Sequence, residues 1–370
     1  MASSPLLIGS CEPFRGKSSL MLGLGRQLIR QGVAIALCKP LATDWEEGAA
    51  LGPDGEPAAP QALDEDVRFI GEILGLQSQQ LLPSLQVLQA SSAQRRLLSG
   101  DLAPGEPFEV LRTRLAQGTD DLVLLEAAGT LSEGLLYGLS LVQMALALQA
   151  PVALVHGWSD SRSVDPLLDA RQQLGDLLAG VVLNAVNPEL VPRLREELVP
   201  ALERLGIPVL GIMPRSPLLR SVTVSELGRR LQARTLCCPE RCDLLVETLS
   251  IGAMNVNSAM EFFRRRRNMA VVTGADRTDI QLAALEASTQ CLILTGAGDP
   301  LPQLISRAEE LDVPVLKVEH DTLTTVEVIE AAIGHGRLHE PVKAAYAIRL
   351  VEEHCRFDRL FDRLRLPQPA

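Results

Sequence analysis

Short, continuously apolar runs alternate with helical patterns over the first 215 residues, and this alternation constrains the fold most strongly. A strand that is covered on both faces lacks the polar alternation of a half-exposed strand, so such runs are typical of a parallel sheet. Helical segments lie between most of the runs, as in βαβ units. The runs are 5–10, 33–40, 121–127, 151–157, 178–186 and 207–214. The sequence therefore predicts an α/β fold with a doubly wound parallel sheet.

A second, smaller α/β unit is predicted from near Val222. Thr223 and Glu226 have the spacing of a capping box, which favours a helix there. Helical segments then alternate with three more apolar runs, 269–274, 291–296 and 313–320. The stretch from about 340 has the pattern of a charged, peripheral helix. We expect three parts, with the bounds 1–220, 221–338 and 339–370.

Composition narrows the classes of partner. The chain has 370 residues, 46% hydrophobic and 22% charged, so it can bury two cores. Its net charge of −11 argues against general affinity for nucleic acid or anionic membranes, although Arg264–Arg267 leaves a local basic patch open. Residues 135–155 are almost uncharged, but Pro151 divides them, which favours a buried helix and a buried strand over a membrane span.

The cysteines indicate a reducing compartment. Seven of them occur without regular spacing, as expected of free thiols in a cytoplasmic protein. Cys237, Cys238 and Cys242 cluster, but no second Cys or His pair follows at zinc-ligand spacing. The N-terminus lacks the basic segment and long apolar run of a signal peptide. We therefore expect a cytoplasmic location.

The first apolar run leads into a phosphate-binding motif. After it, Gly16, Lys17, Ser18 and Ser19 open an amphipathic helix. Free N–H groups at a helix N-terminus, a lysine and a hydroxyl are what a nucleoside triphosphate with Mg²⁺ requires, so we expect Lys17 at the β and γ phosphates and Ser18 at the metal. The motif departs from a standard P-loop, because Cys11 stands where that loop has glycine. The alternative is a plain helix N-terminus.

The N-terminal part resembles the dethiobiotin synthetase family. The resemblance rests on the variant loop, on Lys39-Pro40 after the second run, and on LVLLEAAGTLSEG (122–134), which is similar to the family's Val-Glu-Gly-Ala-Gly segment. It extends to Asn184 and to GIMP (211–214). It implies that Glu126 and Asp66 help bind Mg²⁺ and that Lys39, Asn184 and Pro214 lie beside ATP.

Each of these assignments has a structural alternative. Glu126 could be a solvated carboxylate, Lys39 a surface lysine, and Asn184 a residue that only shapes a turn. Together they are stronger, because they lie at the carboxyl ends of strands, where parallel sheets bind ligands. The stretch 42–62, rich in Gly, Pro and acidic residues, reads as a mobile loop or an active-site lid.

The second unit resembles the DRTGG domain. The segment that carries the resemblance is MAVVTGADRTDIQLAALEAS (269–288), in which Asp276, Arg277 and Thr278 stand at a strand-to-helix turn. These three residues are candidates for a second small ligand, because an arginine at such a turn can bind an anion. The alternative is a capped helix with a structural Arg–Asp pair. In sum we expect a P-loop doubly wound parallel sheet followed by a smaller α/β DRTGG-like domain.

The whole chain resembles the N-terminal region of the long bacterial phosphate acetyltransferases over residues 5–335. In that family the catalytic domain follows this region, so we do not expect acetyl transfer from this chain alone. The leading hypothesis is an ATP- and Mg²⁺-binding regulatory or ligand-sensing protein that forms a homo-oligomer. An ATP-dependent ligase or cyclising carboxylase is the alternative, weakened by Ala-Ala-Gly-Thr (127–130) where the family has a Gly-rich turn. A scaffold with a degenerate nucleotide site is the third hypothesis.

Overall fold

The computed structural model describes residues 2–43, 63–252, 255–287, 289–334, 336 and 338–366. The chain divides into two compact units: unit 1 comprises residues 1–215 and 338–370, and unit 2 comprises residues 216–337. Nearly all of the predicted loop 42–62 lies outside the described residues.

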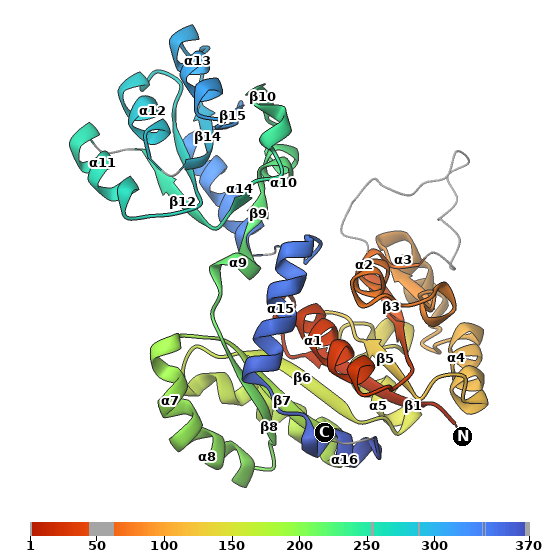
Figure 1. Cartoon of the computed structure of the whole chain (residues 1–370). Coiled ribbons are helices and arrows are strands. Elements are labelled where there is room, and N and C mark those ends of the chain that lie inside the picture. Colours follow the sequence, from red (N-terminus) through yellow and green to blue (C-terminus); the bar gives the residue numbers. More distant parts are fainter. Residues whose placement is uncertain are drawn as a thin grey trace. The chain divides into compact units, whose positions relative to one another are not determined.

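Unit 1 is built on a six-stranded parallel sheet, which confirms the predicted fold class (Figure 1). Five strands are apolar runs buried along most of their length, and the edge strand Val209–Pro214 alternates partly buried with buried residues. The order is β2 (Ile35–Cys38), β5 (Leu122–Glu126), β1 (Ser4–Ser10), β6 (Val152–Gly157), β7 (Leu178–Val186) and β8 (Val209–Pro214). The chain moves from β1 to β2 on one side and later to β6 on the other, so the carboxyl end of β1 is a topological switch point.

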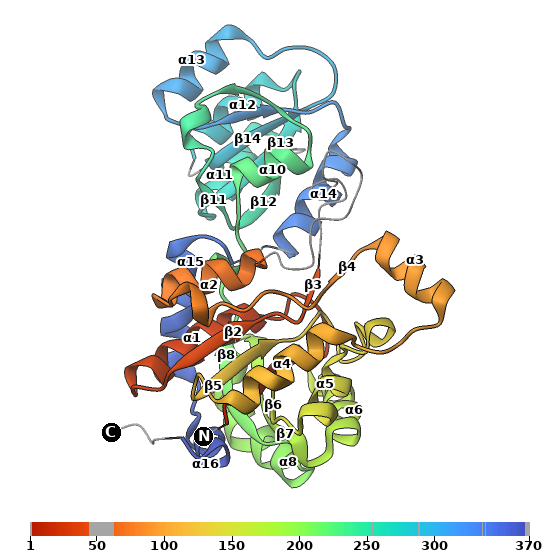
Figure 2. The ribbon, with the colours of Figure 1, turned by 90° about the vertical axis from the view of Figure 1, so that its right-hand side faces the viewer.

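Helices cover both faces of this sheet (Figure 2). One face carries α1 (Lys17–Arg30), α2 (Glu65–Leu74), α15 (Pro341–His354) and α16 (Asp358–Leu364). The other face carries α4 (Glu106–Gln117), α5 (Leu141–Leu148), α6 (Asp165–Leu174) and α8 (Val199–Arg204). The remaining elements are β3 (Leu41–Thr43) paired with β4 (Gln86–Leu88), α3 (Ala90–Ser99) and α7 (Val191–Arg193).

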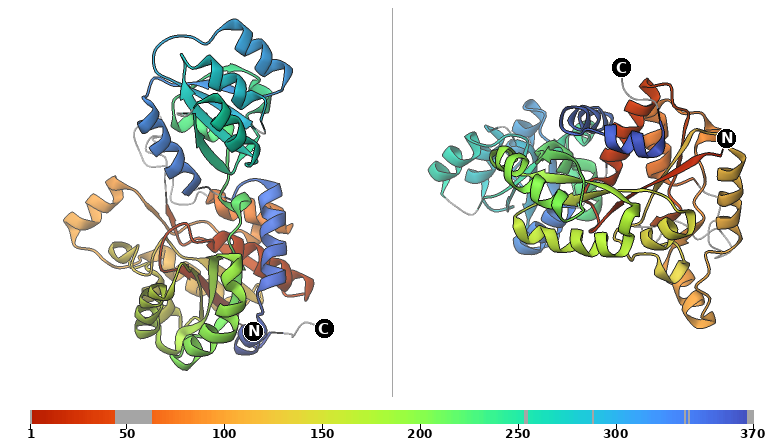
Figure 3. Two further views of the ribbon diagram at one scale, coloured as in Figure 1. Left: turned by 90° about the vertical axis from the view of Figure 1, so that its left-hand side faces the viewer. Right: turned by 90° about the horizontal axis from the view of Figure 1, so that it is seen from below.

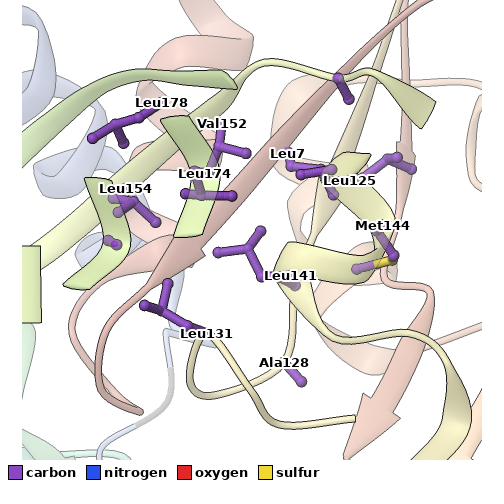
Figure 4. Packing of buried hydrophobic residues seen from close by; sticks show 14 of the residues in the cluster. Leu7, Leu125, Ala128, Leu131, Leu141, Met144, Val152, Leu154, Leu174 and Leu178 are labelled. Carbon is purple, nitrogen blue, oxygen red and sulfur yellow. The ribbon is translucent and has the colours of Figure 1, made fainter. Parts of the chain in front are cut away.

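The core on the second face is almost entirely aliphatic. Figure 4 shows Leu7, Leu125 and Val152 of neighbouring strands beside Leu141 and Met144 of α5. Residues 135–155 supply α5 and β6 to this core, as the sequence predicted. Among the described residues, no helix is both long enough and apolar enough to cross a membrane.

The C-terminal segment differs from the expected peripheral helix. Helix α15 packs along α1 (Figure 3), where a Cβ on Gly23 would come within 2.3 Å of Val351 Cβ. Ala344, Ala347 and Val351 are fully buried. Cys355, directly after α15, forms an antiparallel bridge with Gly211 of β8. Besides its charged residues, α15 carries a narrow apolar stripe. Because this stripe packs on α1, residues 338–366 are part of unit 1.

Unit 2 is a smaller α/β sheet. Its order is β10 (Arg234–Cys237), β15 (Val315–Lys317), β14 (Thr289–Thr295), β13 (Met269–Gly274) and β12 (Thr248–Ile251), with β10 antiparallel to the rest. One face packs against α11 (Val256–Arg264), α12 (Thr278–Leu285) and α13 (Pro302–Glu310), and the other against α10 (Val224–Arg230) and α14 (Thr322–Gly334). Helix α9 (Pro217–Arg220) and the pair β9 (Val222–Thr223) and β11 (Leu245–Val246) complete it.

Candidate nucleotide site

The loop between β1 and α1 needs glycine at its last position. Gly16 has φ 101°, a left-handed conformation, and a Cβ there would lie 2.5 Å from Asn184 Nδ2. Helix α1 begins at Lys17, so the N–H groups of its first turn are directed to the carboxyl edge of the sheet. Ser18 and Ser19 follow in that turn, and Ser19 is buried. The geometry is that of an anion-binding helix N-terminus at the switch point.

Lys17 is held close to the loop without an ionic partner. Its Nζ donates to Ser10 Oγ at 3.3 Å, and it forms no ion pair with any carboxylate of the described residues. Burial lowers the pKa of Lys17, although Glu126 nearby opposes this shift. The ammonium is thus available to an anionic ligand.

Glu126 ends β5 beside the first turn of α1. Ser18 Oγ donates to its Oε1 at 3.5 Å, while Oε2 is buried and has no hydrogen-bond partner within the described parts of the chain. Burial raises the pKa of Glu126 to about 7, and Asp66 contributes in the same direction. A buried carboxylate oxygen without a partner is costly, and a bound cation would satisfy it. The pair of Ser18 and Glu126 therefore fits Mg²⁺.

Lys39 follows β2, and its side chain is almost completely buried among carboxylate side chains. Its Nζ lies 2.5 Å from Asp66 Oδ2 and 3.2 Å from Asp64 Oδ2. Burial disfavours the charged form of Lys39, but the carboxylates of Asp66, Glu126 and Asp64 raise its pKa above the usual value. The alternative of a surface lysine is excluded, since the Lys39 side chain is only 8% exposed.

Asp66 has a second partner that sequence reasoning missed. His339 Nε2 lies 2.8 Å from Asp66 Oδ1, and the His339 ring packs against Phe69 of α2. Burial opposes ionisation of Asp66, but the hydrogen bonds to His339 and Lys39 hold its pKa well below the usual range. No local pattern could have linked His339 to a residue 273 positions earlier.

Asn184 shapes the loop in this structure. Its Nδ2 donates to Arg15 O at 2.7 Å, and its Oδ1 accepts from Ala185 N at 2.7 Å. Pro214 ends β8 and is paired in register with Val186 of β7. The first of these contacts ties Asn184 to the loop between β1 and α1, and base recognition by Asn184 stays a prediction.

Most of the predicted site residues therefore lie at one edge of one sheet. No group of three or more His, Cys, Asp or Glu side chains that could hold a metal occurs in the described parts of the chain. That result leaves Mg²⁺ with a nucleotide open, because this ion usually takes one or two carboxylates together with phosphate oxygens and water. All seven cysteines are free, and burial raises the pKa of Cys237 to about 12.

The second-ligand candidates lie in unit 2 at the carboxyl end of β13. Helix α12 begins at Thr278, directly after Asp276 and Arg277. Arg277 Nε lies 3.3 Å from Asp279 Oδ1, which is the structural pair that was the alternative to ligand binding. Binding of a second ligand by Asp276, Arg277 and Thr278 stays a prediction.

The comparisons with known proteins match the two units separately. Residues 5–223 match the AAA domain family, and residues 226–332 match the DRTGG domain. The chain is 24% identical to a phosphate acetyltransferase of Synechocystis sp., over 98% of this chain and 52% of that protein. It is 32% identical to the ATP-dependent dethiobiotin synthetase BioD of Pseudomonas aeruginosa, over 60% of this chain and 92% of that protein.

Solved structures give weaker matches. MinD cell division protein of Aquifex aeolicus aligns with a TM-score of 0.34 and 15% identity, over 59% of this chain and 84% of that chain. The chain spans about half the length of the phosphate acetyltransferases that it matches.

Proposed function

The chain belongs to the AAA domain family through residues 5–223, and we propose from this membership that unit 1 binds ATP with Mg²⁺ as a regulatory or ligand-sensing device. The observation that carries the proposal is the cluster at the carboxyl edge of its sheet. There Lys17 has no ionic partner among the described residues, and Glu126 presents a buried oxygen without a hydrogen-bond partner beside Ser18.

In this proposal each side chain has a distinct task. Lys17 and the N–H groups of the first turn of α1 bind the β and γ phosphates. Ser18 and Glu126 hold Mg²⁺, and Asp66 joins them when it exchanges a present partner for the ion. The metal supplies charge neutralisation of the phosphates. Lys39 keeps Asp66 ionised and adds positive charge beside the γ phosphate.

The two chain connections between unit 1 and unit 2 support a regulatory role for the nucleotide site. Unit 2 begins at Ser216, two residues after Pro214, and unit 1 resumes at Leu338, one residue before His339. Both covalent connections to unit 2 therefore start beside candidate site residues. Since His339 contacts Asp66, withdrawal of Asp66 by Mg²⁺ would release one connection. A ligand that binds the two states with different affinity shifts the balance between them.

The test of the nucleotide site is thermal unfolding with and without Mg-ATP. At 100 times its dissociation constant a ligand adds about 2.7 kcal/mol, which corresponds to a rise of about 5–10 °C in Tm. We expect this rise in the wild type and its loss in Lys17→Ala. Arg112→Ala, which changes an exposed residue paired with Glu109, is the matched control and should keep the rise. No rise in the wild type at millimolar Mg-ATP would refute nucleotide binding.

An ATP-dependent ligase or cyclising carboxylase is the second candidate. The 32% identity to BioD favours it, as does Lys39, which lies close enough to lower the pKa of Lys17. Two lysines at one edge could neutralise an acyl-phosphate transition state. ATP turnover separates the candidates: a ligase is stimulated by its amine or acid substrate, whereas a sensor is not.

The proposed regulation has its own readout. Sedimentation of the full chain with and without Mg-ATP should show a change of homo-oligomeric state while turnover stays slow. The same oligomeric state with and without nucleotide would argue against regulation through self-association. It would not contradict the proposal that unit 1 binds nucleotide.

A further inference from the structure

Two basic side chains face each other at the carboxyl edge of the sheet in unit 2. Arg234 opens β10 and Lys317 ends β15, and the two residues are directly opposite in the antiparallel register. Directly opposed residues project to the same face of a sheet with their Cβ atoms about 5 Å apart, and like charges in such a pair are unfavourable. The arrangement therefore calls for a negative partner.

Lys317 is the buried member of the pair. Only 7% of the residue is exposed, and its Nζ donates to the carbonyl oxygens of Gly296 and Val318. No carboxylate among the residues that the structure describes pairs with it. A buried ammonium without a counter-ion is costly, whereas an anion at this position would neutralise it.

The same two cations hold the loop between β14 and α13. Lys317 binds the Gly296 carbonyl oxygen, and Arg234 Nη2 lies 2.9 Å from Asp299 Oδ1. The Asp299 carboxylate thus occupies, from within the chain, the position that an external anion would take on Arg234. The Arg234 and Asp299 side chains are 66% and 78% exposed, so solvent screens this pair and a stronger anion can displace it.

The loop itself leaves room for a ligand. Gly296 and Gly298 have φ 80° and 98°, and a Cβ on either would meet no heavy atom within 4 Å. Helix α13 follows the loop with no side-chain cap and no acidic residue in its first turn. Two acidic residues follow Lys317 along the chain: Glu319 is exposed, and Asp321 is engaged by Thr324 N and Thr324 Oγ1 at the start of α14.

We propose that unit 2 binds a phosphate group between Arg234 and Lys317, beneath the 296–299 loop. Phosphate suits the site better than a single carboxylate, because three acceptor oxygens can meet the ammonium, the guanidinium fork and a loop N–H at once. The group is either free phosphate or part of a phosphoester, and both present the same three oxygens. This site is separate from the Asp276–Thr278 turn and is independent of the nucleotide site in unit 1.

The test is equilibrium dialysis of radiolabelled inorganic phosphate against the full chain carrying Lys17→Ala, at constant ionic strength. This background removes the loop lysine of unit 1 as a source of binding. We expect saturable uptake of one phosphate per chain, weakened at least tenfold by Arg234→Gln and by Lys317→Gln. Asp299→Asn, which removes the internal competitor, should tighten binding several-fold.

The controls separate folding from binding. Arg241→Gln changes an exposed arginine at the opposite edge of unit 2 and should leave binding unchanged. Lys317 is buried, so circular dichroism and Tm must show that the Lys317→Gln variant is folded. Arg234 is exposed, so loss of phosphate binding in Arg234→Gln supports the site without that check. Stronger competition by a phosphomonoester than by free phosphate would identify the phosphoester as the source, and weaker competition would identify free phosphate. Absence of saturable uptake, unchanged uptake in Arg234→Gln, or equal competition by acetate would overturn the proposal.

Discussion

Glu126 is the residue whose protonation most directly controls the candidate nucleotide site. Burial raises its pKa from 4.5 to about 7, so the folded state binds a proton that the unfolded state releases between those values. A carboxyl group with a raised pKa in the folded state contributes stability below pH 4.5, and this contribution is lost as the pH rises through 7. Mg²⁺ requires the deprotonated form.

We therefore predict opposite pH trends for the free protein and for its complex. Relative to Glu126→Gln, the free energy of unfolding of the ligand-free wild type should fall from pH 5 to pH 8. The affinity for Mg-ATP should rise over the same range, with a proton released on binding near pH 6. Calorimetry in buffers of different ionisation enthalpy measures that proton. Identical pH profiles in the wild type and Glu126→Gln would show that another group titrates.

The residues of the candidate site differ in how readily the sequence indicates them. Gly16, Lys17 and Ser18 are contiguous and follow an apolar strand, so the motif predicts their position at a helix N-terminus. Glu126 could be placed because the carboxyl ends of parallel strands meet at one edge. His339 could not, since it reaches Asp66 only through the return of the chain to unit 1.

At the scale of elements, the close packing of α15 on α1 requires a glycine in α1. Gly23 lies in the middle of α1, where glycine is normally about 1 kcal/mol worse than alanine. Here the close approach of Val351 makes glycine necessary, because a Cβ would lie 2.3 Å from Val351 Cβ. The packing of the two helices thus outweighs helix propensity at this position.

A double-mutant cycle tests this packing. We expect Gly23→Ala to destabilise the protein by about 1–3 kcal/mol through overpacking. Val351→Ala should cost about 1–3 kcal/mol through the cavity that it leaves. Together they should cost less than the sum, because each relieves the other. Urea unfolding gives the free energies. Gly228→Ala in α10, where the nearest atom is 3.8 Å away, is the control and should be near neutral; strict additivity would contradict the proposed contact.

Strands and helices could be predicted from the sequence where most of their residues are buried. Those that are only partly buried were harder to predict. The six strands of the first sheet are mainly apolar, so their predicted positions agree within a few residues with the observed ones. Strand β12 is only partly buried, and its short sequence Thr-Leu-Ser-Ile carries no clear pattern. Helix α15 was expected at the periphery because charged residues interrupt its apolar pattern, which hides the stripe of small apolar residues that packs on α1.

At the scale of the whole molecule, unit 2 is an insertion in unit 1. A boundary at residue 220 follows the change of sequence pattern, but a chain cut there would lack α15 and α16. The lost segment carries Ala344, Ala347, Val351, Phe357 and Phe361, all of which are buried. Unit 1 would then expose the apolar face of α1 to water.

Removal of unit 2 should be tolerated better than truncation. We predict that residues 1–215 joined to 338–366 by a Gly/Ser linker of about 15 residues, which spans roughly 20 Å, unfold cooperatively. Residues 1–220 alone should unfold at a lower temperature with a broad transition. Differential scanning calorimetry of both chains decides this. An equally sharp transition at the same temperature in both would show that α15 and α16 add little to unit 1.

The late return of the chain to unit 1 also sets an order of events on the ribosome. Domains generally fold as they emerge, with the N-terminal part first. Here the strands of the first sheet emerge first, but α15 and α16 are synthesised only after all of residues 216–337. Unit 2 can complete its fold while unit 1 still lacks part of one helical layer. The nascent chain therefore carries an uncovered apolar surface on α1 for the whole time that unit 2 is being translated, and this is the interval in which a chaperone would act on it.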